Sequence, residues 1–393
     1  MKIKFLCFVL FFPAILHAQE VDGRLIEENF AFAEKQYLFM KEQNPAPDRM
    51  PQSYDAKTGK FDARDITWWC SGFYPGTLWY IYEQTGSEAI RKEAERALAV
   101  IEPNQHFTGN HDLGFMMYCS FGNAYRLTGN EAYKPVILNA ARSLSTRYRP
   151  QIYSIQSWNK NDYFNCPVII DNLMNLEMLI RATQMGGDSR FREIAVIHAN
   201  TTLKNHFRPD YSSYHVVDYN LETGQPLRKA TWQGAANTSA WSRGQAWALY
   251  GYTTLYGLTR DPAYLKQARG IAGFILDHPN LPGDKIPYWD FDAPLQPKAY
   301  RDASAGAIIA SALLELGQYT SGAEKDRYVR DAGHMIRSLA SDTYRAKYGE
   351  NGGFLLKHSV GALPLNSEID VPLIYADYYF LEALKRYKDW YLR

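Results

Sequence analysis

The chain has 393 residues, a formal net charge of +1 and interspersed basic and acidic side chains. The absence of a basic tract argues against nucleic acid or a membrane surface as a partner. Aromatic residues make up 15% of the chain, including 29 Tyr and 9 Trp; aromatic faces stack on sugar rings, although a large core also explains many of them.

The N-terminus has the pattern of a secretory signal peptide. Residues 1–4 are a basic start, residues 5–15 are an apolar run too short to span a membrane comfortably, and Ala18 is a small residue at the expected cleavage point. We therefore expect residues 1–18 to be removed and residues 19–393 to be exported, with a bacterial periplasm as the expected location. No second long apolar run follows, so we expect no membrane span.

Cysteine usage and ligand spacing give no sign of a metal or a cofactor. Cys70, Cys119 and Cys166 are an odd number of widely spaced residues, which argues against both a disulfide framework and a zinc site. The scattered His, Asp and Glu residues lack metal-ligand spacing, and the chain has no nucleophile elbow and no phosphate loop. We expect no cofactor, and no pattern indicates the oligomeric state.

A helical hairpin recurs along the chain. In each copy one helix ends, a tight turn with Gly or Pro follows, and a second helix begins on a polar or acidic residue. Five such turns lie at residues 82–86, 125–133, 185–191, 257–264 and 318–323. Further helices are expected at residues 25–43, 72–83 and 371–386, which gives about twelve helices, or six hairpins.

The two helices of a hairpin differ in their apolar pattern. The second helices place apolar residues at three- and four-residue spacing, whereas first helices such as 241–258 and 303–316 are rich in Gly, Ala and aromatic residues on all sides. A helix that is apolar all round is buried. The sequence therefore predicts an all-α, single-domain ring in which buried inner helices alternate with amphipathic outer ones.

Three long connectors are expected to gather at one end of this ring. Residues 152–167, 206–240 and 276–302 are rich in Asn, Asp, Gly, Pro and aromatic residues. Each follows an outer helix and precedes an inner one, so all three should lie where the inner helices begin. Connectors of this length in a compact domain usually serve a function.

Two aspartates lie at the expected starts of inner helices. Asp112 precedes the apolar run 113–117, and Asp171 lies between 168–170 and 173–176. An ionised carboxylate is costly to bury unless it is paired, hydrogen-bonded or protonated, and a pair of carboxyl groups is typical of sugar-cleaving enzymes. The alternative is that each Asp caps its helix. Their shared end of the ring favours a catalytic site.

Arg243 begins a buried helix and needs an anionic partner because it cannot lose its charge. A protein carboxylate would make a structural ion pair; a substrate carboxylate would use the guanidinium fork for recognition. Trp241 and Trp247 would then form stacking walls around the substrate, the alternative being that they pack in the core.

Other candidate substrate-binding residues are His111, His215, Gln233 and Trp69. A lone His is more often a hydrogen-bonded core residue than a catalyst, but His111 adjoins Asp112 and His215 shares a long connector with Gln233. Trp69 comes just before the first inner helix and could face the same cavity.

Four segments in this order resemble the signature blocks of unsaturated glucuronyl hydrolases, family 88 of the glycoside hydrolases. They are residues 111–115, 169–176, 241–247 and 368–384, which span most of the mature chain. The resemblance implies an (α/α)6 barrel, in agreement with the hairpin count. It also implies a substrate: oligosaccharides released by polysaccharide lyases, with a C4=C5 double bond in their non-reducing uronic acid.

The resemblance further implies a reaction in which the enol ether is hydrated and no displacement occurs at the anomeric carbon. Asp171 is then the general acid/base, which protonates C4 and activates the water that attacks C5. Asp112 is the partner carboxylate, expected to hydrogen-bond the ring hydroxyls and Asp171. The positions of the family's substrate contacts are His111, His215, Gln233, Arg243, Trp247 and Trp69.

Physical chemistry supports these roles independently. Protonating the enol ether creates positive charge at C5, which a nearby carboxylate stabilises. Asp171 must begin protonated, and burial together with the like charge of Asp112 is expected to raise its pKa.

The alternatives are an unsaturated rhamnogalacturonyl hydrolase acting on pectin fragments, a conventional two-carboxylate glycosidase and a non-catalytic helical-repeat protein that binds carbohydrate. The polymer that supplies the substrate stays open among glycosaminoglycan types and ulvan. Residues 357–359 could meet the next sugar, where a cation would suit a sulfated partner; the alternative is a solvated face.

Overall fold

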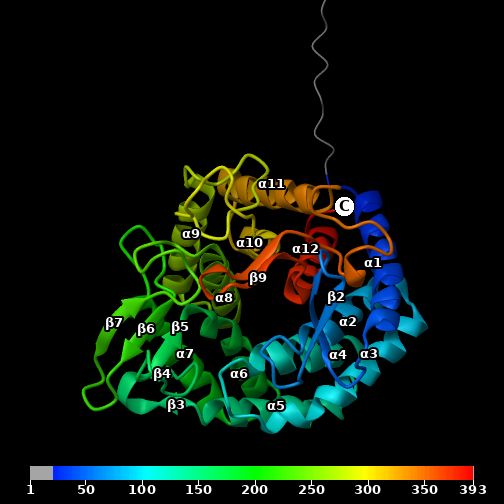
Figure 1. Ribbon diagram of the computed structural model, residues 1–393. Helices are drawn as coiled ribbons and strands as arrows, with labels where there is room; N and C mark the ends of the chain where they lie inside the picture. Colours follow the sequence, from blue (N-terminus) through cyan, green and yellow to red (C-terminus); the bar gives the residue numbers. More distant parts are fainter. Residues whose placement is uncertain (1–20, 393) are drawn as a thin grey trace, which may run out of the picture.

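The computed structural model describes residues 21–392, and the expected signal peptide at residues 1–18 lies outside them. Helices form a closed double ring around a central axis (Figure 1). The inner helices are α2 (Phe73–Thr85), α4 (Asn123–Thr128), α6 (Leu176–Gln184), α8 (Ser242–Thr259), α10 (Ala303–Gln318) and α12 (Ile374–Tyr391). The outer helices are α1 (Gly23–Gln43), α3 (Glu88–Ile101), α5 (Tyr133–Ser145), α7 (Ser189–Asn205), α9 (Pro262–Asp277) and α11 (Gly322–Leu339).

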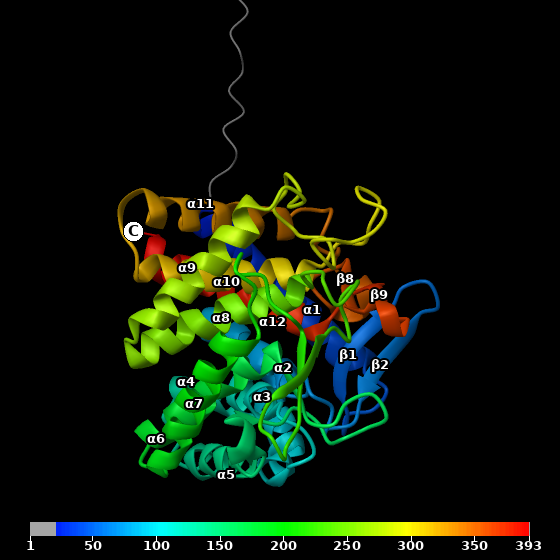
Figure 2. The same ribbon diagram turned by 90° about the vertical axis from the view of Figure 1, so that its left-hand side faces the viewer.

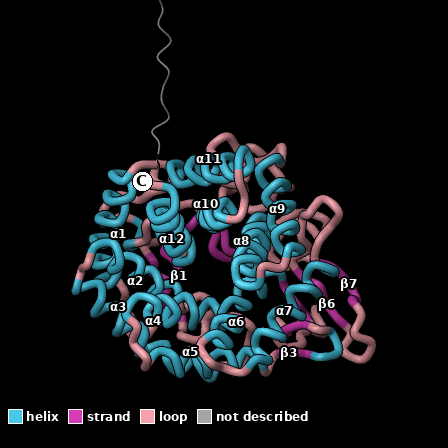
Figure 3. The backbone as a smooth tube through the Cα atoms, turned by 180° about the vertical axis from the view of Figure 1, so that it is seen from behind, coloured by secondary structure: helices cyan, strands magenta, loops and turns pink. Residues whose placement is uncertain are grey.

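Burial separates the two rings in the way the apolar patterns predict. Every residue of α8 from Ser242 to Leu255 is buried, whereas α3 buries one stripe that includes Ile90, Ala94 and Ala97. Figure 3 shows the ring of helices from behind. The prediction of an all-α, single-domain (α/α)6 barrel is confirmed.

Short strands, which the helical pattern does not predict, lie between several of the helices. The hairpin of β1 (Met50–Asp55) and β2 (Lys60–Arg64) lies with the hairpin of β8 (Ser359–Ala362) and β9 (Ser367–Val371) at one end of the barrel (Figure 2). An antiparallel sheet joins β5 (Pro167–Ile169), β6 (Val216–Tyr219) and β7 (Pro226–Ala230). A minor pair is formed by β3 (Tyr148–Arg149) and β4 (Ser154–Ile155).

Three helix starts differ from the expectation. Residues 371–373 are not helical, since Val371 ends β9 and α12 begins at Ile374. Two inner helices open in non-α form: the π-helix η2 (Gly114–Gly122) leads into α4, and the 3-10 helix η4 (Ile170–Asn175) leads into α6. Both irregular openings adjoin the two aspartates, and π-helical turns occur frequently at functional sites. No helix among residues 21–392 is long and apolar enough to cross a membrane.

Candidate active site

Asp112 and Asp171 come together because η2 and η4 pack against each other. Asp112 precedes η2, and Asp171 is the second residue of η4. Their side chains are 13% and 11% exposed, so both carboxyl groups are largely buried yet reachable from the solvent. Neither carboxylate accepts a cap hydrogen bond from its helix. The alternative that each aspartate caps its own helix is therefore wrong.

The two carboxyl groups have raised pKa values. Burial raises the pKa of Asp171 to about 7, against the opposing charge of Arg243 and the nearby indole N–H of Trp247. Burial also raises the pKa of Asp112 well above its usual value, and the negative charge of Asp171 adds to the effect. Because repulsion between two carboxylates is reciprocal, it disfavours the state in which both groups are ionised. Among the described residues the two side chains share no direct hydrogen bond, contrary to the expectation for Asp112.

A neutral histidine faces each aspartate. His215 Nε2 lies 3.7 Å from Asp171 Oδ2, and His111 Nε2 lies 3.3 Å from Asp112 Oδ1. Burial lowers the pKa of both imidazoles to about 3, so neither carries a charge at neutral pH.

The tautomer of His215 follows from its backbone contacts. The N–H groups of Trp232 and Gln233 donate to His215 Nδ1 at 3.1 and 3.3 Å. Since Nδ1 accepts, the proton of the neutral ring is on Nε2 and is directed at Asp171. His215 can therefore hydrogen-bond a carboxylate at position 171 without protonating it.

Arg243 forms a buried ion pair with the protein itself. Its Nη1 donates to Asp302 Oδ2 at 3.0 Å and also to the Val360 carbonyl, while Nη2 donates to the Gly361 carbonyl at 2.5 Å. The side chain is 1% exposed. Of the two partners considered for Arg243, the structure contains the protein carboxylate. Recognition of a substrate carboxylate would have to use its remaining N–H groups and stays a prediction.

The three tryptophans differ in their exposure. Trp247 is fully buried against Phe115, with ring centroids 5.1 Å apart, and Trp241 packs on the His215 ring at 4.5 Å. Trp69 is only partly buried and contacts Phe115 at 5.4 Å. Core packing thus describes Trp241 and Trp247, while Trp69 retains a surface on which a sugar can stack.

Several polar atoms beside Asp171 are buried without a hydrogen-bond partner among the described residues. They are Asp171 Oδ2, His215 Nε2 and the indole nitrogen of Trp247. Buried polar groups are nearly always satisfied, so unpartnered atoms gathered at one place indicate a site for a polar ligand. The Gln233 side chain, by contrast, has a hydrogen-bond partner: its Nε2 donates to the Gly361 carbonyl at 3.1 Å.

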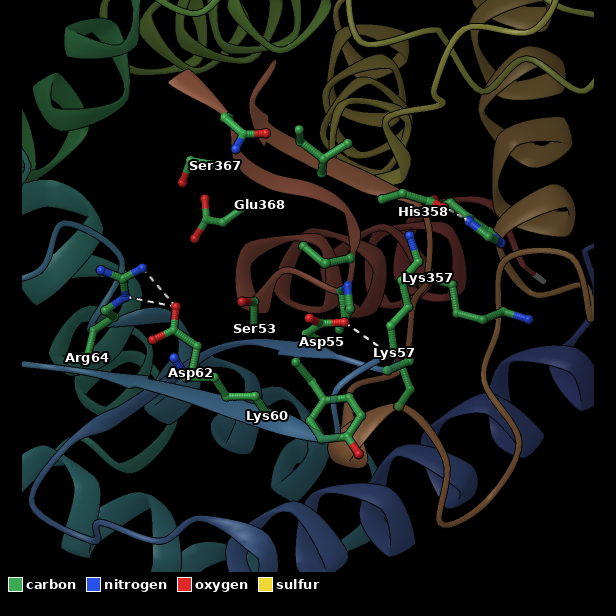
Figure 4. A pocket seen from close by; sticks show the side chains of 18 residues that line it. Ser53, Asp55, Lys57, Lys60, Asp62, Arg64, Lys357, His358, Ser367 and Glu368 are labelled. Carbon is green, nitrogen blue, oxygen red and sulfur yellow. Dashed lines mark hydrogen bonds and ion pairs between the residues drawn. The ribbon is translucent and has the colours of Figure 1, made fainter. Parts of the chain in front are cut away.

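A cavity of about 750 Å³ lies between the β1–β2 and β8–β9 hairpins (Figure 4). Its lining includes Lys57, Lys60, Lys357 and Glu368, but neither Asp112 nor Asp171. The β8–β9 hairpin connects it to the carboxyl pair, because the Gly361 carbonyl accepts from Arg243 while the Glu368 side chain packs on the Gly361 backbone. Of residues 357–359, Lys357 and His358 line this second compartment.

Three residues of the site region were not predicted as site residues: Asp302, Glu368 and Asn175. Asp302 caps α10 through its Oδ1, a signal visible in the sequence as Asp before a small-residue helix. Glu368 opens the C-terminal signature block, whereas nothing local marks Asn175. Residues 21–392 contain no group of three His, Cys, Asp or Glu side chains that could hold a metal ion.

A six-hairpin barrel with two buried, protonatable carboxyl groups beside aromatic surfaces defines an enzyme that cleaves carbohydrate. The chain belongs to Glycosyl Hydrolase Family 88, whose sequence profile matches residues 43–392, and it is a hydrolase acting on O-glycosyl bonds.

Its relatives agree with this assignment. The chain is 47% identical to an unsaturated glucuronyl hydrolase of Formosa agariphila over 83% of this chain and 81% of the relative. It is 33% identical to an unsaturated chondroitin disaccharide hydrolase of Streptococcus pyogenes over 90% and 88%. The crystal structure of an unsaturated glucuronyl hydrolase specific for heparin matches with a TM-score of 0.90 and 45% identity, covering 94% of this chain and 98% of that one.

A further structure contains a ligand. It is an unsaturated glucuronyl hydrolase mutant from Streptococcus agalactiae complexed with dGlcA-GalNAc6S, which matches with a TM-score of 0.81 and 29% identity over 100% of both chains.

Proposed function

We propose that the protein removes the Δ4,5-unsaturated uronic acid from the non-reducing end of oligosaccharides made by polysaccharide lyases, by hydration of the C4=C5 bond. The observation that supports this best is Asp171, a carboxyl group whose pKa is about 7 and which has a neutral His215 N–H and an unpartnered oxygen at the same place. Such a group can donate a proton near neutral pH and accept one in the next step.

The proposed reaction begins when protonated Asp171 transfers its proton to C4. Positive charge then develops at C5 and the ring oxygen, beside the newly formed Asp171 carboxylate, which stabilises it. The carboxylate next takes a proton from the water that attacks C5. The resulting hemiketal opens and releases the next sugar with a free hydroxyl group, together with a keto-acid product.

His215 and Asp112 assist without being consumed. The Nε2–H of His215 can hydrogen-bond the Asp171 carboxylate after the first proton transfer. Burial and the charge of Asp171 raise the pKa of Asp112, and in its protonated form Asp112 can donate a hydrogen bond to a sugar hydroxyl. Two carboxyl groups with raised pKa values suit this hydration better than a conventional retaining mechanism, which requires one carboxylate to be an ionised nucleophile.

The pH dependence of kcat/KM tests this assignment. Because the first step needs protonated Asp171, kcat/KM should be constant below about pH 6 and fall as pH rises through 7, with a limiting slope of about one decade per pH unit. The measurement is a pH series that follows the loss of absorbance of the unsaturated sugar. A rate that increases with pH over the same interval would assign the limiting step to a general base.

We further propose that the next sugar is sulfated, as in fragments of glycosaminoglycans. Of the cations that line the 750 Å³ cavity, Arg64 pairs with Asp62 at 2.8 Å, but the ammonium groups of Lys57 and Lys60 form no ion pair with a described residue. The structure of a relative specific for heparin and the complex containing GalNAc6S point the same way. A neutral sugar at that position, such as the rhamnose of rhamnogalacturonan fragments, carries no anionic group to pair with these cations.

A panel of unsaturated disaccharides tests the substrate class. Sulfated heparin- or chondroitin-type disaccharides should have kcat/KM about tenfold above their unsulfated counterparts, and added NaCl should reduce the difference because it screens exposed charges. Unsaturated rhamnogalacturonan disaccharides should react least. Equal rates on sulfated and unsulfated substrates would remove the sulfate from the proposal and leave the hydrolase assignment intact.

The expected signal peptide supports a further proposal, that the mature enzyme acts in the periplasm on lyase products taken up from outside. N-terminal sequencing of the protein from a cell fractionation tests this: a mature chain that begins at Gln19 supports it, and an intact Met1 in the cytoplasmic fraction contradicts it.

A further inference from the structure

Asn175 connects the two segments that carry the aspartates. Its side-chain Oδ1 accepts hydrogen bonds from the backbone N–H groups of Gly114 at 2.7 Å and Phe115 at 3.3 Å. The Asn175 side chain is fully buried. Both N–H groups belong to the start of η2, and Asn175 is the last residue of η4.

The hydrogen bonds satisfy groups that η2 cannot satisfy itself. The first N–H groups of any helix lack a partner within the helix, and a neighbouring side chain usually caps them. Here the residue before η2, Leu113, provides no side-chain cap. The cap comes instead from another inner segment, 60 and 61 residues further along the chain.

Gly114 allows this close contact. A Cβ atom at position 114 would lie 2.6 Å from the Asn175 Cα and 2.7 Å from its Oδ1, both too short for any other residue. The two signature blocks, residues 111–115 and 169–176, therefore interlock through the backbone of one and the side chain of the other.

The contact between Gly114 and Asn175 lies within a few residues of each carboxyl group. Gly114 is the second residue after Asp112, and Asn175 is the fourth after Asp171, within the same 3-10 helix. Because η2 and η4 are hydrogen-bonded helical elements, joining them here constrains the separation of the two carboxyl groups. That separation sets the effect of the Asp171 charge on the pKa of Asp112, and close packing keeps water from Asp171.

We propose that Asn175 is a positioning residue that holds Asp112 and Asp171 at their working separation and degree of burial. The inference rests on the proposed roles of the two aspartates. Asn175 takes no part in proton transfer itself. Loss of its hydrogen bonds lets η2 shift and water enter, which disturbs the alignment of the proton donor with C4 and lowers the pKa of Asp171.

The test compares Asn175→Leu with a matched control. Asn123→Leu also removes a buried Asn between inner helices, where Nδ2 donates to the Cys119 carbonyl and to Tyr378 Oη, both at 2.9 Å. We expect Asn175→Leu to lower kcat by about 10²-fold with KM within about threefold, since a misplacement of about 1 Å has an effect of that size. The pH at which kcat/KM falls should move below that of the parent enzyme. Asn123→Leu should lose a similar amount of thermal stability but keep the parent's pH profile.

A second variant approaches the same contact from the other segment. Gly114→Ala should reproduce the lower kcat and the shifted pH profile, even if Asn175→Leu does not fold. The proposal is overturned if either folded variant keeps the parent's pH profile and loses kcat only in proportion to its unfolded fraction.

Two separate measurements distinguish a failure of the positioning role from a failure of the proposed function. NMR titration of the Asp112 and Asp171 carboxyl carbons reports their pKa values without any substrate. If the parent enzyme does not process unsaturated disaccharides, the proposed function fails, whereas unchanged carboxyl titration in a folded Asn175→Leu variant contradicts the positioning role alone.

Discussion

Asp171→Asn is expected to lower kcat by about 10³-fold or more while leaving KM close to that of the parent, since general acid and base catalysis contributes about 10²- to 10⁴-fold at each proton transfer. An amide has the shape of the carboxyl group and can still hydrogen-bond His215, but it has no proton to give to C4. The measurement is the steady-state loss of absorbance of an unsaturated disaccharide. Turnover comparable to the parent would remove Asp171 from the chemistry.

The same substitution has a predictable effect on stability. The pKa of Asp171 is higher in the folded protein, about 7, than its usual value of 3.8, so the folded state binds this proton more tightly. The stabilisation is complete below pH 3.8 and is lost as pH rises through 7. An uncharged Asn avoids that loss, and the Tm of Asp171→Asn at pH 8 should equal or exceed the parent's. A lower Tm at pH 8 would mean that the inactivity reflects damage to the fold.

Asp377 provides the matched control. It is a fully buried carboxyl group on α12 whose pKa burial also raises to about 7, but it accepts hydrogen bonds from the Leu355 and Leu356 N–H groups and from Tyr37 Oη. Asp377→Asn should lower the Tm and leave kcat within about threefold, because general acid catalysis requires a group within reach of the substrate. A raised pKa alone thus does not distinguish the proposed catalyst from Asp377, whereas the unpartnered oxygen of Asp171 does.

The fold was predictable from the sequence because its signals are local. Gly86 and Gly129 end α2 and α4 in the left-handed conformation that Gly adopts without strain, and the all-apolar pattern of α8 and α10 marks them as inner helices. The hairpins β1–β2 and β8–β9 have no comparable signal, since strands of four to six residues give little periodicity. The π-helical and 3-10 openings of η2 and η4 depend on tertiary contacts such as the Asn175 cap.

The site was predictable to the extent that its residues share one end of the barrel. That argument brings Asp112 and Asp171 together, but it cannot choose between partners of Arg243. The carboxylate it pairs with, Asp302, is 59 residues away and precedes another inner helix, α10, and the two carbonyl groups it contacts belong to β8. Such choices depend on side-chain geometry, which spacing does not encode.

Asp302→Asn is expected to destabilise the folded protein by about 3–5 kcal/mol, the usual cost of leaving one member of a buried ion pair without its partner. Asp302 has two roles that the substitution separates. Its Oδ1 accepts from the Ser304 N–H at 3.1 Å at the start of α10, and its Oδ2 accepts from Arg243. Asn is as good a helix cap as Asp, so the loss should come almost entirely from the uncompensated guanidinium. Urea unfolding at pH 7 measures it.

A cap without an ion pair provides the comparison. Asp261 begins α9 and accepts from the Ala263 N–H at 2.9 Å, but it has no buried cation beside it, so Asp261→Asn should change the free energy of unfolding by less than about 1 kcal/mol. Arg243 lowers the pKa of Asp171 through its charge. Without Asp302 this effect should strengthen, and the fall in kcat/KM should move to lower pH. Equal destabilisation by the two substitutions would show that Asp302 acts only as a cap, and the buried cation would then need compensation from the Val360 and Gly361 carbonyl groups alone.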